Sequence, residues 1–275
     1  MNLLSLEPGS YGHQAARLHD PKAEISFCKG NLDIISRTQN GEGLGVLPIE
    51  NSTEGLVMEV IKGFWLKDAK EKPIYVTGEL QIPINHCLMG IPGTDLSSVT
   101  QVISHPQSLG QCAGTLKALG IEVRNPAISN PRAAKQVSEG KDPTVVAIAP
   151  AIAAELFGLE ILQVGIQDFK ENATRFHLIS TTPAKMTGCD RTALVCHLPN
   201  RPRSLADAID IIGDLGSSLS TIHSIPLGRP GCYASYMELD GHRDCVIGKQ
   251  IIARIAEVTG GKFRILGSYP RSVVN

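Results

Sequence analysis

Thr174 and Arg175 stand side by side in the stretch NATRFHLIS, at the start of an alternating apolar run that is typical of a β-strand. A threonine hydroxyl can donate a hydrogen bond, and an arginine guanidinium pairs with carboxylates through two parallel N–H groups. At the end of a strand, these two side chains could bind an anion and donate a proton to it. The stretch therefore predicts a site for an anionic small molecule.

Further polar side chains follow other predicted strands, where helices begin. Ser10 lies in EPGSYGHQAA, Asn51 and Ser52 follow the strand that ends at Glu50, and Ser104 opens SHPQSLGQC. Helix starts offer free backbone N–H groups and a positive dipole end, and in parallel α/β sheets they meet at one edge. Grouped around one cleft, they would suit a molecule that carries two carboxylates.

Each of these residues also has a simpler explanation when it is taken alone. Serine, threonine and asparagine cap helices in most α/β proteins, so capping accounts for Ser10 and Ser104. Glu50 could be a solvated strand end, and Arg175 could be a structural ion-pair partner. The joint occurrence of the helix starts with the TRF stretch favours a ligand site over these explanations.

The elements that would position these residues alternate between strand and helix over the first two thirds of the chain. Strand-like runs such as 43–50, 99–105 and 144–150 are each followed by a helical pattern, which predicts a parallel α/β sheet. The segment 77–90 is broken by proline and glycine and is predicted to be extended. It is a candidate crossover between two lobes.

A boundary rich in Ser, Thr, Pro and Gly falls at 180–190. The pattern after it predicts the order βαββαβ in one compact unit, which is the ferredoxin-like plan. We therefore expect two domains, at residues 1–182 and 188–275.

Composition excludes several classes of function. The formal net charge is -1 and aromatic residues make up 4%, which argues against nucleic acid as a partner. The seven cysteines are an odd number without a CxxC pair, so disulfides and a zinc site are not expected. No apolar run reaches the roughly 18 residues of a membrane span, and the N-terminus does not have the pattern of a signal peptide. We expect a cytoplasmic protein that does not associate with membranes.

Together the motifs resemble those of the prephenate dehydratase family. The matching stretches are EPGSYGHQAA, IENSTEG, SHPQSLGQC, NATRF and the C-terminal RILGSYP. They occur in the expected order and span almost the whole chain. The resemblance implies a two-lobed catalytic domain similar to periplasmic binding proteins of type 2, followed by an ACT domain. It also implies assembly as a homodimer or homotetramer.

The resemblance further implies a lyase that converts prephenate to phenylpyruvate, CO2 and water in phenylalanine biosynthesis, without a metal or other cofactor. Thr174 would donate a hydrogen bond to the departing ring hydroxyl, and Arg175 and Asn51 would complete the catalytic set. Arg175 would pair with a substrate carboxylate or hold Thr174 in place. The expected substrate-binding residues are Ser10, Glu50, Ser52, Ser104 and Phe176.

In this family phenylalanine is the usual effector of the ACT domain, and this sequence departs from the two motifs associated with it. RSLA (203–206) stands where the family has GALV, and HSIP (223–226) where it has ESRP. Arg203 would add bulk where a ligand should dock, so we expect phenylalanine to inhibit weakly. The candidate effector-binding residues are Leu205, Ser218, Leu219 and Ser224.

Three alternatives remain at this stage. Arogenate dehydratase would run the same chemistry on a substrate with an amine in place of the ketone, and these residues do not separate the two. A non-aromatising prephenate decarboxylase is disfavoured because such relatives lack both the TRF threonine and the ACT domain. A sensor or binding protein without catalysis would bind its ligand equally well without Thr174.

Overall fold

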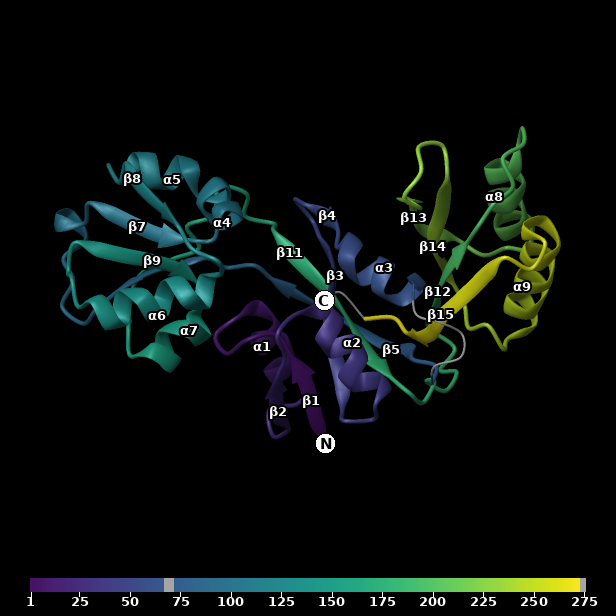
Figure 1. Ribbon diagram of the computed structural model, residues 1–275, viewed down its shortest axis with the longest axis horizontal. Helices are drawn as coiled ribbons and strands as arrows, with labels where there is room; N and C mark the ends of the chain where they lie inside the picture. The colour runs from purple at the N-terminus through teal and green to yellow at the C-terminus, as the bar shows by residue number, and fades with distance from the viewer. Residues whose placement is uncertain (67–71, 273–275) are drawn as a thin grey trace.

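The computed structural model describes residues 1–66 and 72–272, and in it three sheets follow one another along the long axis of the molecule (Figure 1). The central sheet has the strand order β2-β1-β3-β11-β5, with β4 paired to β3. We call it, with its helices, the first lobe. Its strands are β1 (Asn2–Ser5), β2 (Glu24–Phe27), β3 (Leu44–Asn51), β4 (Gly55–Leu56), β5 (Tyr75–Pro83) and β11 (Ala173–Ser180), and its helices are α1 (Tyr11–His19), α2 (Asn31–Gln39) and α3 (Met58–Leu66).

The second lobe, at the left in Figure 1, is built on a sheet of order β10-β6-β9-β7-β8. Its strands are β6 (Cys87–Gly90), β7 (Gln101–Ser104), β8 (Val123–Pro126), β9 (Val145–Ala149) and β10 (Glu160–Val164). Its helices are α4 (Pro106–Gln111), α5 (Ala113–Ala118), α6 (Asn130–Gly140) and α7 (Ala151–Phe157), with a short 3-10 turn η1 (Leu96–Ser98).

The chain passes between the lobes twice. Residues 84–86 join β5 to β6, and residues 165–172 lead from β10 back to β11. The predicted crossover within 77–90 is therefore confirmed. The expectation of parallel sheets is only partly correct, because β11 runs antiparallel to β3 and β5, and β6 runs antiparallel to β9 and β10. These antiparallel pairs involve the strands next to the crossings, and the short β4 is also antiparallel to β3.

Residues 190–270 form the third sheet, which we call the C-terminal unit. Its elements are β12 (Asp190–Cys196), α8 (Ser204–Asp214), β13 (Leu219–Pro226), β14 (Tyr233–Asp240), α9 (Val246–Thr259) and β15 (Phe263–Pro270). This is the βαββαβ order, with an antiparallel sheet of order β13-β14-β12-β15. Helices α8 and α9 pack on one face of the sheet and lie far from the first lobe (Figure 1).

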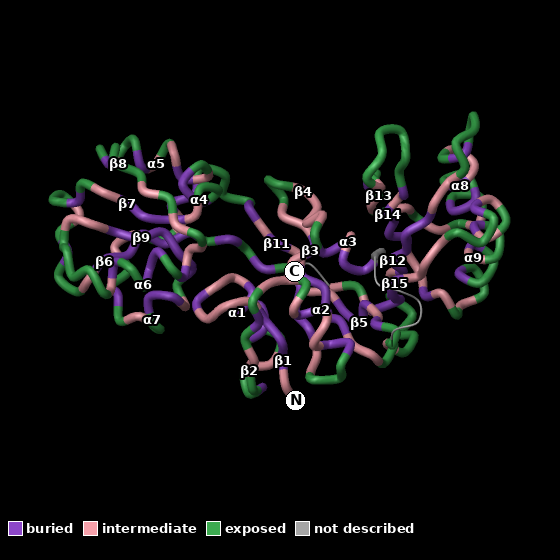
Figure 2. Tube along the Cα trace, viewed as in Figure 1, coloured by how far each residue is buried: buried purple, intermediate pink, exposed green. Residues whose placement is uncertain are grey.

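Side chains alternate between two cores on either face of the central sheet. Phe176 and Leu178 of β11 belong to a core beneath α1. Ile179 faces the other way, into a core that also contains Tyr236 and Tyr269 of the C-terminal unit. The first lobe and the C-terminal unit therefore share one apolar core, and Figure 2 shows the buried segments of both meeting there.

The helix starts follow ordinary capping rules. Ser10 caps α1 by accepting a hydrogen bond from the His13 N–H, and Ser129 caps α6 by accepting one from the Arg132 N–H. Pro106 occupies the first turn of α4, where its missing N–H costs nothing. Within the described ranges, no helix is both long and apolar enough to cross a membrane.

Candidate active site

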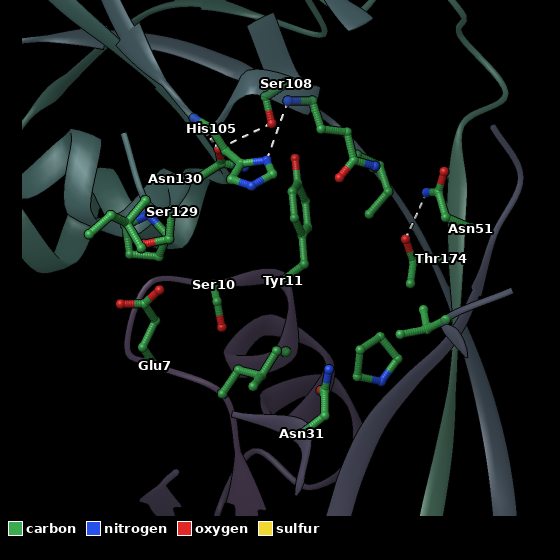
Figure 3. A pocket seen from close by; sticks show the side chains of 18 of the residues that line it. Glu7, Ser10, Tyr11, Asn31, Asn51, His105, Ser108, Ser129, Asn130 and Thr174 are labelled. Carbon is green, nitrogen blue, oxygen red and sulfur yellow. Dashed lines mark hydrogen bonds between the residues drawn. The ribbon is translucent and has the colours of Figure 1, made fainter. Parts of the chain in front are cut away.

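A cavity of about 790 Å³ lies between the two lobes, with walls from both. We call it the interlobe cavity. Figure 3 shows Ser10, Tyr11, Asn51 and Thr174 on the side of the first lobe, facing Ser108, Ser129 and Asn130 of the second. Most of the labelled side chains end in hydroxyl or amide groups, so the cavity offers many neutral hydrogen-bonding atoms. Its lining is thus suited to a small polar molecule.

Thr174 and Asn51 form the most informative contact in the cavity. They are directly opposite each other on β11 and β3, and Asn51 Nδ2 donates to Thr174 Oγ1 over 2.9 Å. The orientation of the Asn51 amide is fixed by its other end, because Oδ1 accepts from the backbone N–H of Thr53 at 3.0 Å and of Glu54 at 3.2 Å. Since the Thr174 oxygen already accepts this bond, the Thr174 hydroxyl hydrogen is free to be donated to a molecule in the cavity.

Asn172, the residue before β11, also bonds to the Asn51 amide. Its Oδ1 accepts from Asn51 Nδ2 at 2.9 Å, and its Nδ2 donates to Gln111 Oε1 of the second lobe at 3.2 Å. Asn172 is 2% exposed, so this amide is held within the wall and does not face solvent. The side chain therefore links the Thr174 strand to the opposite lobe.

A second chain of contacts runs through Tyr11, His86 and Gln111. The Tyr11 hydroxyl lies 2.9 Å from His86 Nδ1, and His86 Nε2 lies 2.9 Å from Gln111 Oε1. Because Gln111 Nε2 donates to Thr53 Oγ1, its Oε1 must be the acceptor toward His86. His86 is then protonated on Nε2, and the Tyr11 hydroxyl donates to Nδ1. Burial lowers the pKa of His86 and raises the pKa of Tyr11, which keeps both neutral.

Sequence reasoning did not assign a role to Tyr11, His86 or Gln111. Tyr11 and Gln111 lie inside the quoted stretches EPGSYGHQAA and SHPQSLGQC, so their positions carried a signal. His86 lies in the crossover between the lobes and has no motif of its own. Only the fold brings it between the other two.

Of the site residues proposed from the sequence, Ser10, Asn51, Thr174 and Phe176 lie in the lining of the interlobe cavity. Ser10 lies at the start of α1, beside Gly9, which has the left-handed φ of +82°. An added Cβ at Gly9 would lie 3.4 Å from side chains of the second lobe. Ser10 is therefore held where the two lobes approach each other.

Ser52 and Ser104 are predicted substrate contacts that the structure does not place in the lining. Ser104 is fully buried, with its Oγ 2.9 Å from Asn130 Oδ1 and 2.8 Å from the Ile148 carbonyl. It supports Asn130, which does line the cavity. Ser52 Oγ accepts from the Ala173 N–H at 3.0 Å, so it braces the start of β11 from an exposed turn.

Arg175 and Glu50, for which contact with substrate was expected, do not line the interlobe cavity. Successive side chains of a strand point to opposite faces, so Arg175 points away from the cavity that Thr174 faces. Its guanidinium pairs with Glu50 at 2.9 Å and Glu79 at 3.0 Å, and with Glu238 of the C-terminal unit at 2.8 Å. Its guanidinium is thus surrounded by three carboxylates on the face of β11 that is turned away from the cavity. The alternative expectation, that Arg175 holds Thr174 in place, fits this geometry.

The candidate effector residues fall into two groups. Ser218 and Leu219 are at the start of β13, whereas Ser224 is near its other end. Leu205 lies in the first turn of α8 and is 43% exposed. Since a strand rises about 3.3 Å per residue, roughly 17–20 Å of chain separates Ser224 from Ser218 and Leu219. Within one chain these residues do not form a single site.

Among the residues that the structure describes, no group of three or more His, Cys, Asp or Glu side chains is arranged to hold a metal ion.

The family model and the similar proteins indicate the same family. Residues 7–184 match the family model of prephenate dehydratase. A prephenate dehydratase of Methanocaldococcus jannaschii is 31% identical, over 98% of this chain and 97% of the relative. Arogenate dehydratase 3 of Arabidopsis thaliana is 36% identical, over 98% of this chain and 66% of the relative.

Two solved structures share the whole architecture. The prephenate dehydratase of Arthrobacter aurescens in complex with L-Phe has 30% identity and a TM-score of 0.86, covering 100% of this chain and 93% of the other. GqqA, a quorum quenching acylase, has 26% identity and a TM-score of 0.85, covering 98% of both chains. Since the family model spans both lobes and the archaeal relative matches almost end to end, the chain belongs to the prephenate dehydratase family.

Proposed function

We propose that this protein converts prephenate to phenylpyruvate, CO2 and water, as a lyase of phenylalanine biosynthesis. The observation that carries the proposal is the Thr174 hydroxyl at the wall of the interlobe cavity. Asn51 Nδ2 donates to its oxygen, so its hydrogen is available to a substrate. This is the group that the reaction needs, since hydroxide leaves a ring poorly without a hydrogen-bond or proton donor.

Loss of the two groups is coupled in this mechanism. The C–C bond to the ring carboxylate breaks, its electron pair enters the ring, and the C–O bond to the hydroxyl breaks as the ring becomes aromatic. The Thr174 hydroxyl donates a hydrogen bond that strengthens as charge develops on the departing oxygen, which leaves as water with a proton from solvent. Threonine itself is too weak an acid to give up its proton fully.

The walls of the cavity would hold the two carboxylates differently. The N-termini of α1, at Ser10, and of α6, at Ser129, both open into the cavity and suit the side-chain carboxylate. The ring carboxylate would lie nearer the apolar Phe176. Strong pairing with a cation there would oppose loss of CO2, whereas apolar surroundings favour it.

Arogenate is the second candidate substrate. The Arabidopsis relative named arogenate dehydratase is 36% identical, and the lining of the cavity includes the carboxylates of Glu7 and Glu59, which could pair with an ammonium group. The two substrates share the ring at which Thr174 would act. A preference between them would reside in contacts to the side chain.

We propose that the C-terminal unit is an ACT domain at 188–275, following a catalytic domain at 1–182; residues 273–275 lie outside the described part of the chain. The βαββαβ order supports it. The Arthrobacter relative binds L-Phe, which makes phenylalanine the candidate effector here as well. Its site would require a second chain, since the candidate residues are divided between the two ends of β13. β13 is an edge strand, a surface on which a partner strand can add, so a homodimer or homotetramer is part of the proposal.

We place the enzyme in the cytoplasm. All seven cysteines are present as free thiols, the form that a reducing compartment maintains.

The test is to incubate the purified protein with prephenate or with arogenate at neutral pH and to quantify phenylpyruvate and phenylalanine. Phenylpyruvate formed from prephenate, with the larger kcat/KM, supports the proposal. A larger kcat/KM for arogenate would replace it with the second candidate. Binding of either compound without turnover would make the protein a sensor.

A further inference from the structure

The strand that carries Thr174 has a second face, turned toward the C-terminal unit. Thr174 and Phe176 line the interlobe cavity, while Arg175 and His177 lie on the opposite face of β11. Figure 1 shows β11 at the centre of the molecule, with the second lobe on one side and the C-terminal unit on the other. A single strand therefore contacts the candidate substrate on one face and the C-terminal unit on the other.

The contact is made by a group of charged residues centred on the buried Glu238, which we call the ion cluster: Arg175, Arg191, Glu50, Glu79 and Glu238. Glu238 is 0% exposed, and Arg175 Nη1 lies 2.8 Å from its Oε2 and 3.0 Å from its Oε1. Arg191 of β12 lies 3.0 Å from Glu79 and 3.7 Å from Glu238. Arg175 thus pairs with Glu79 of its own sheet and with Glu238 of β14.

Aromatic and histidine side chains orient Glu238 in turn. The Tyr236 hydroxyl donates to Glu238 Oε1, and the Tyr269 hydroxyl lies 3.3 Å from the same oxygen. His177 Nε2 is 3.4 Å from it. Burial alone would raise the pKa of Glu238, but the contacts with His177 and Arg175 hold it well below the usual value, so Glu238 is ionised. Its carboxylate is a fixed anchor for Arg175.

The pairing of β11 with β3 is irregular next to Arg175, whereas the pairing of β11 with β5 is regular from Ala173 to Leu178. The pairing of β11 with β3 shifts register between Arg175 and Phe176, so Ile49 has no partner opposite. A bulge changes the local twist and re-aims the neighbouring side chains. Arg175 lies opposite Glu50 at the edge of this bulge, so their ion pair joins β11 to β3 at the place where the ladder between these two strands is interrupted.

Stability alone is a poor explanation for the ion cluster. A buried ion pair costs so much desolvation that apolar residues of similar volume often stabilise a protein as well or better. A cluster of ion pairs instead holds each of its side chains in one orientation. Here that orientation is imposed on the residue bonded to Thr174.

We propose that Arg175 is a positioning residue for Thr174, and that Glu238 of the C-terminal unit is the anchor that fixes Arg175. This inference rests on the proposed function, in which Thr174 contacts the reacting oxygen. It makes the C-terminal unit a structural component of the catalytic strand. Any ligand or partner chain that shifts β14 would then change turnover through Glu238.

The substitution that tests this is Glu238→Gln. With His177 neutral, the ion cluster holds three carboxylates against two guanidinium groups, so removal of one negative charge leaves two of each sign. The variant keeps the shape of the side chain and weakens the bond to Arg175. We expect kcat to fall by about 10-fold or more, because a buried charge-assisted hydrogen bond is lost, with KM for the substrate changed by less than about 2-fold. In a Thr174→Ala background, the same substitution should have no further effect on residual turnover.

The matched control is Leu266→Ala. Leu266 lies in the same shared core, on β15, and carries no group that can bond to Arg175. Its loss should reduce the thermal stability while kcat of the folded enzyme stays within about 2-fold of wild type. If Glu238→Gln does not fold, Tyr236→Phe removes one hydrogen bond to Glu238 and should lower kcat by about 3-fold.

A second readout does not need turnover. Amide hydrogen exchange of residues 173–177 should be faster in Glu238→Gln than in wild type and in Leu266→Ala. If wild type turns over neither prephenate nor arogenate, the proposed function fails and this exchange measurement still decides the positioning role. The inference is overturned if Glu238→Gln changes neither kcat nor amide exchange. It is also overturned if Leu266→Ala loses as much kcat as Glu238→Gln does, or if Glu238→Gln lowers turnover further in the Thr174→Ala background.

Discussion

At the scale of single residues, the alternation along β11 separates two roles that the sequence places side by side. Thr174 faces the cavity, and Arg175 faces Glu238. The cavity-lining position of Thr174, Asn51 and Ser10 could be predicted from the sequence, because each follows or begins an element at the sheet edge. The partners of Arg175 could not, since Glu238 and Glu79 lie 63 and 96 residues away along the chain.

Asn51→Asp tests the donor to Thr174. A carboxylate can still accept from the N–H groups of Thr53 and Glu54, but it cannot donate to Thr174 Oγ1 and would compete for the Thr174 hydrogen. We expect kcat to fall roughly 100-fold, the effect of losing a positioned donor in an active site. Ser52→Ala, in the adjacent exposed turn, is the control. It should change kcat by less than about 5-fold, since the Ser52 hydroxyl bonds to the Ala173 N–H and does not line the cavity. Steady-state kinetics of both variants would check this, and wild-type turnover by Asn51→Asp would disprove it.

At the scale of elements, the order of strands and helices is largely readable from periodicity, whereas strand pairing is not. The βαββαβ order and the crossover between lobes were both predictable, because each element carries its own pattern of apolar residues. The insertion of β11 between β3 and β5 joins segments that lie far apart in sequence, with nothing local to specify it. For the same reason the packing of β15 against β5 was not foreseen.

Gly267 of β15 packs directly against the backbone of Val76 in β5. A Cβ at this position would lie 2.1 Å from the Val76 carbonyl oxygen, which is backbone and cannot step aside. Gly267→Ala should therefore destabilise the protein by about 1–3 kcal/mol. Gly213→Ala in α8 is the matched control, since nothing lies near its added Cβ, and it should stabilise by about 0.5–1 kcal/mol. Urea unfolding of the two variants gives the comparison, and equal effects would contradict the packing described.

Arg203 stands where the motif of the family has a glycine, and its backbone has a left-handed φ of +65°, a conformation that favours glycine. Its side chain pairs with Asp207 and Asp210 on the surface of α8. Arg203→Gly should relieve strain and raise stability by about 1 kcal/mol. It should also strengthen inhibition by L-phenylalanine, which we expect to be weak in the wild type. Thermal melts and an inhibition titration measure the two effects, and strong inhibition of the wild type would refute the second.

At the scale of the whole molecule, polar side chains join its parts. His86 connects Tyr11 of the first lobe with Gln111 of the second, and Glu238 connects the C-terminal unit with Arg175 and His177 of the first lobe. Burial lowers the pKa of His13, His86 and His177 below the ordinary value of 6.5. The contacts of His86 between the lobes depend on this neutrality, because the Tyr11 hydroxyl donates to its unprotonated Nδ1. Acid should therefore loosen the junction between the two lobes.

Stability should accordingly be full above pH 6.5 and decline as the pH falls below it. The unfolded chain takes up protons on these histidines near pH 6.5, whereas the folded chain takes them up only at lower pH, so protons favour unfolding in between. Glu238, with its lowered pKa, adds a further loss below about pH 4.5, where the unfolded carboxylate is protonated first. Thermal melts from pH 8 to pH 4 would follow this decline, and a melting temperature that rises on acidification from pH 7 to pH 5 would contradict it.

The measurement that bears most directly on the account is the turnover of prephenate by Thr174→Ser and Thr174→Val, with substrate binding measured separately by calorimetry. Serine keeps the hydroxyl, and valine keeps the shape without it. We predict that Thr174→Ser retains turnover within about 10-fold of wild type, while Thr174→Val loses at least about 100-fold in kcat with little change in affinity. Equal turnover by the two variants, or a loss in Thr174→Val that lies wholly in binding, would contradict the assignment of Thr174 as the group that assists the departing hydroxyl.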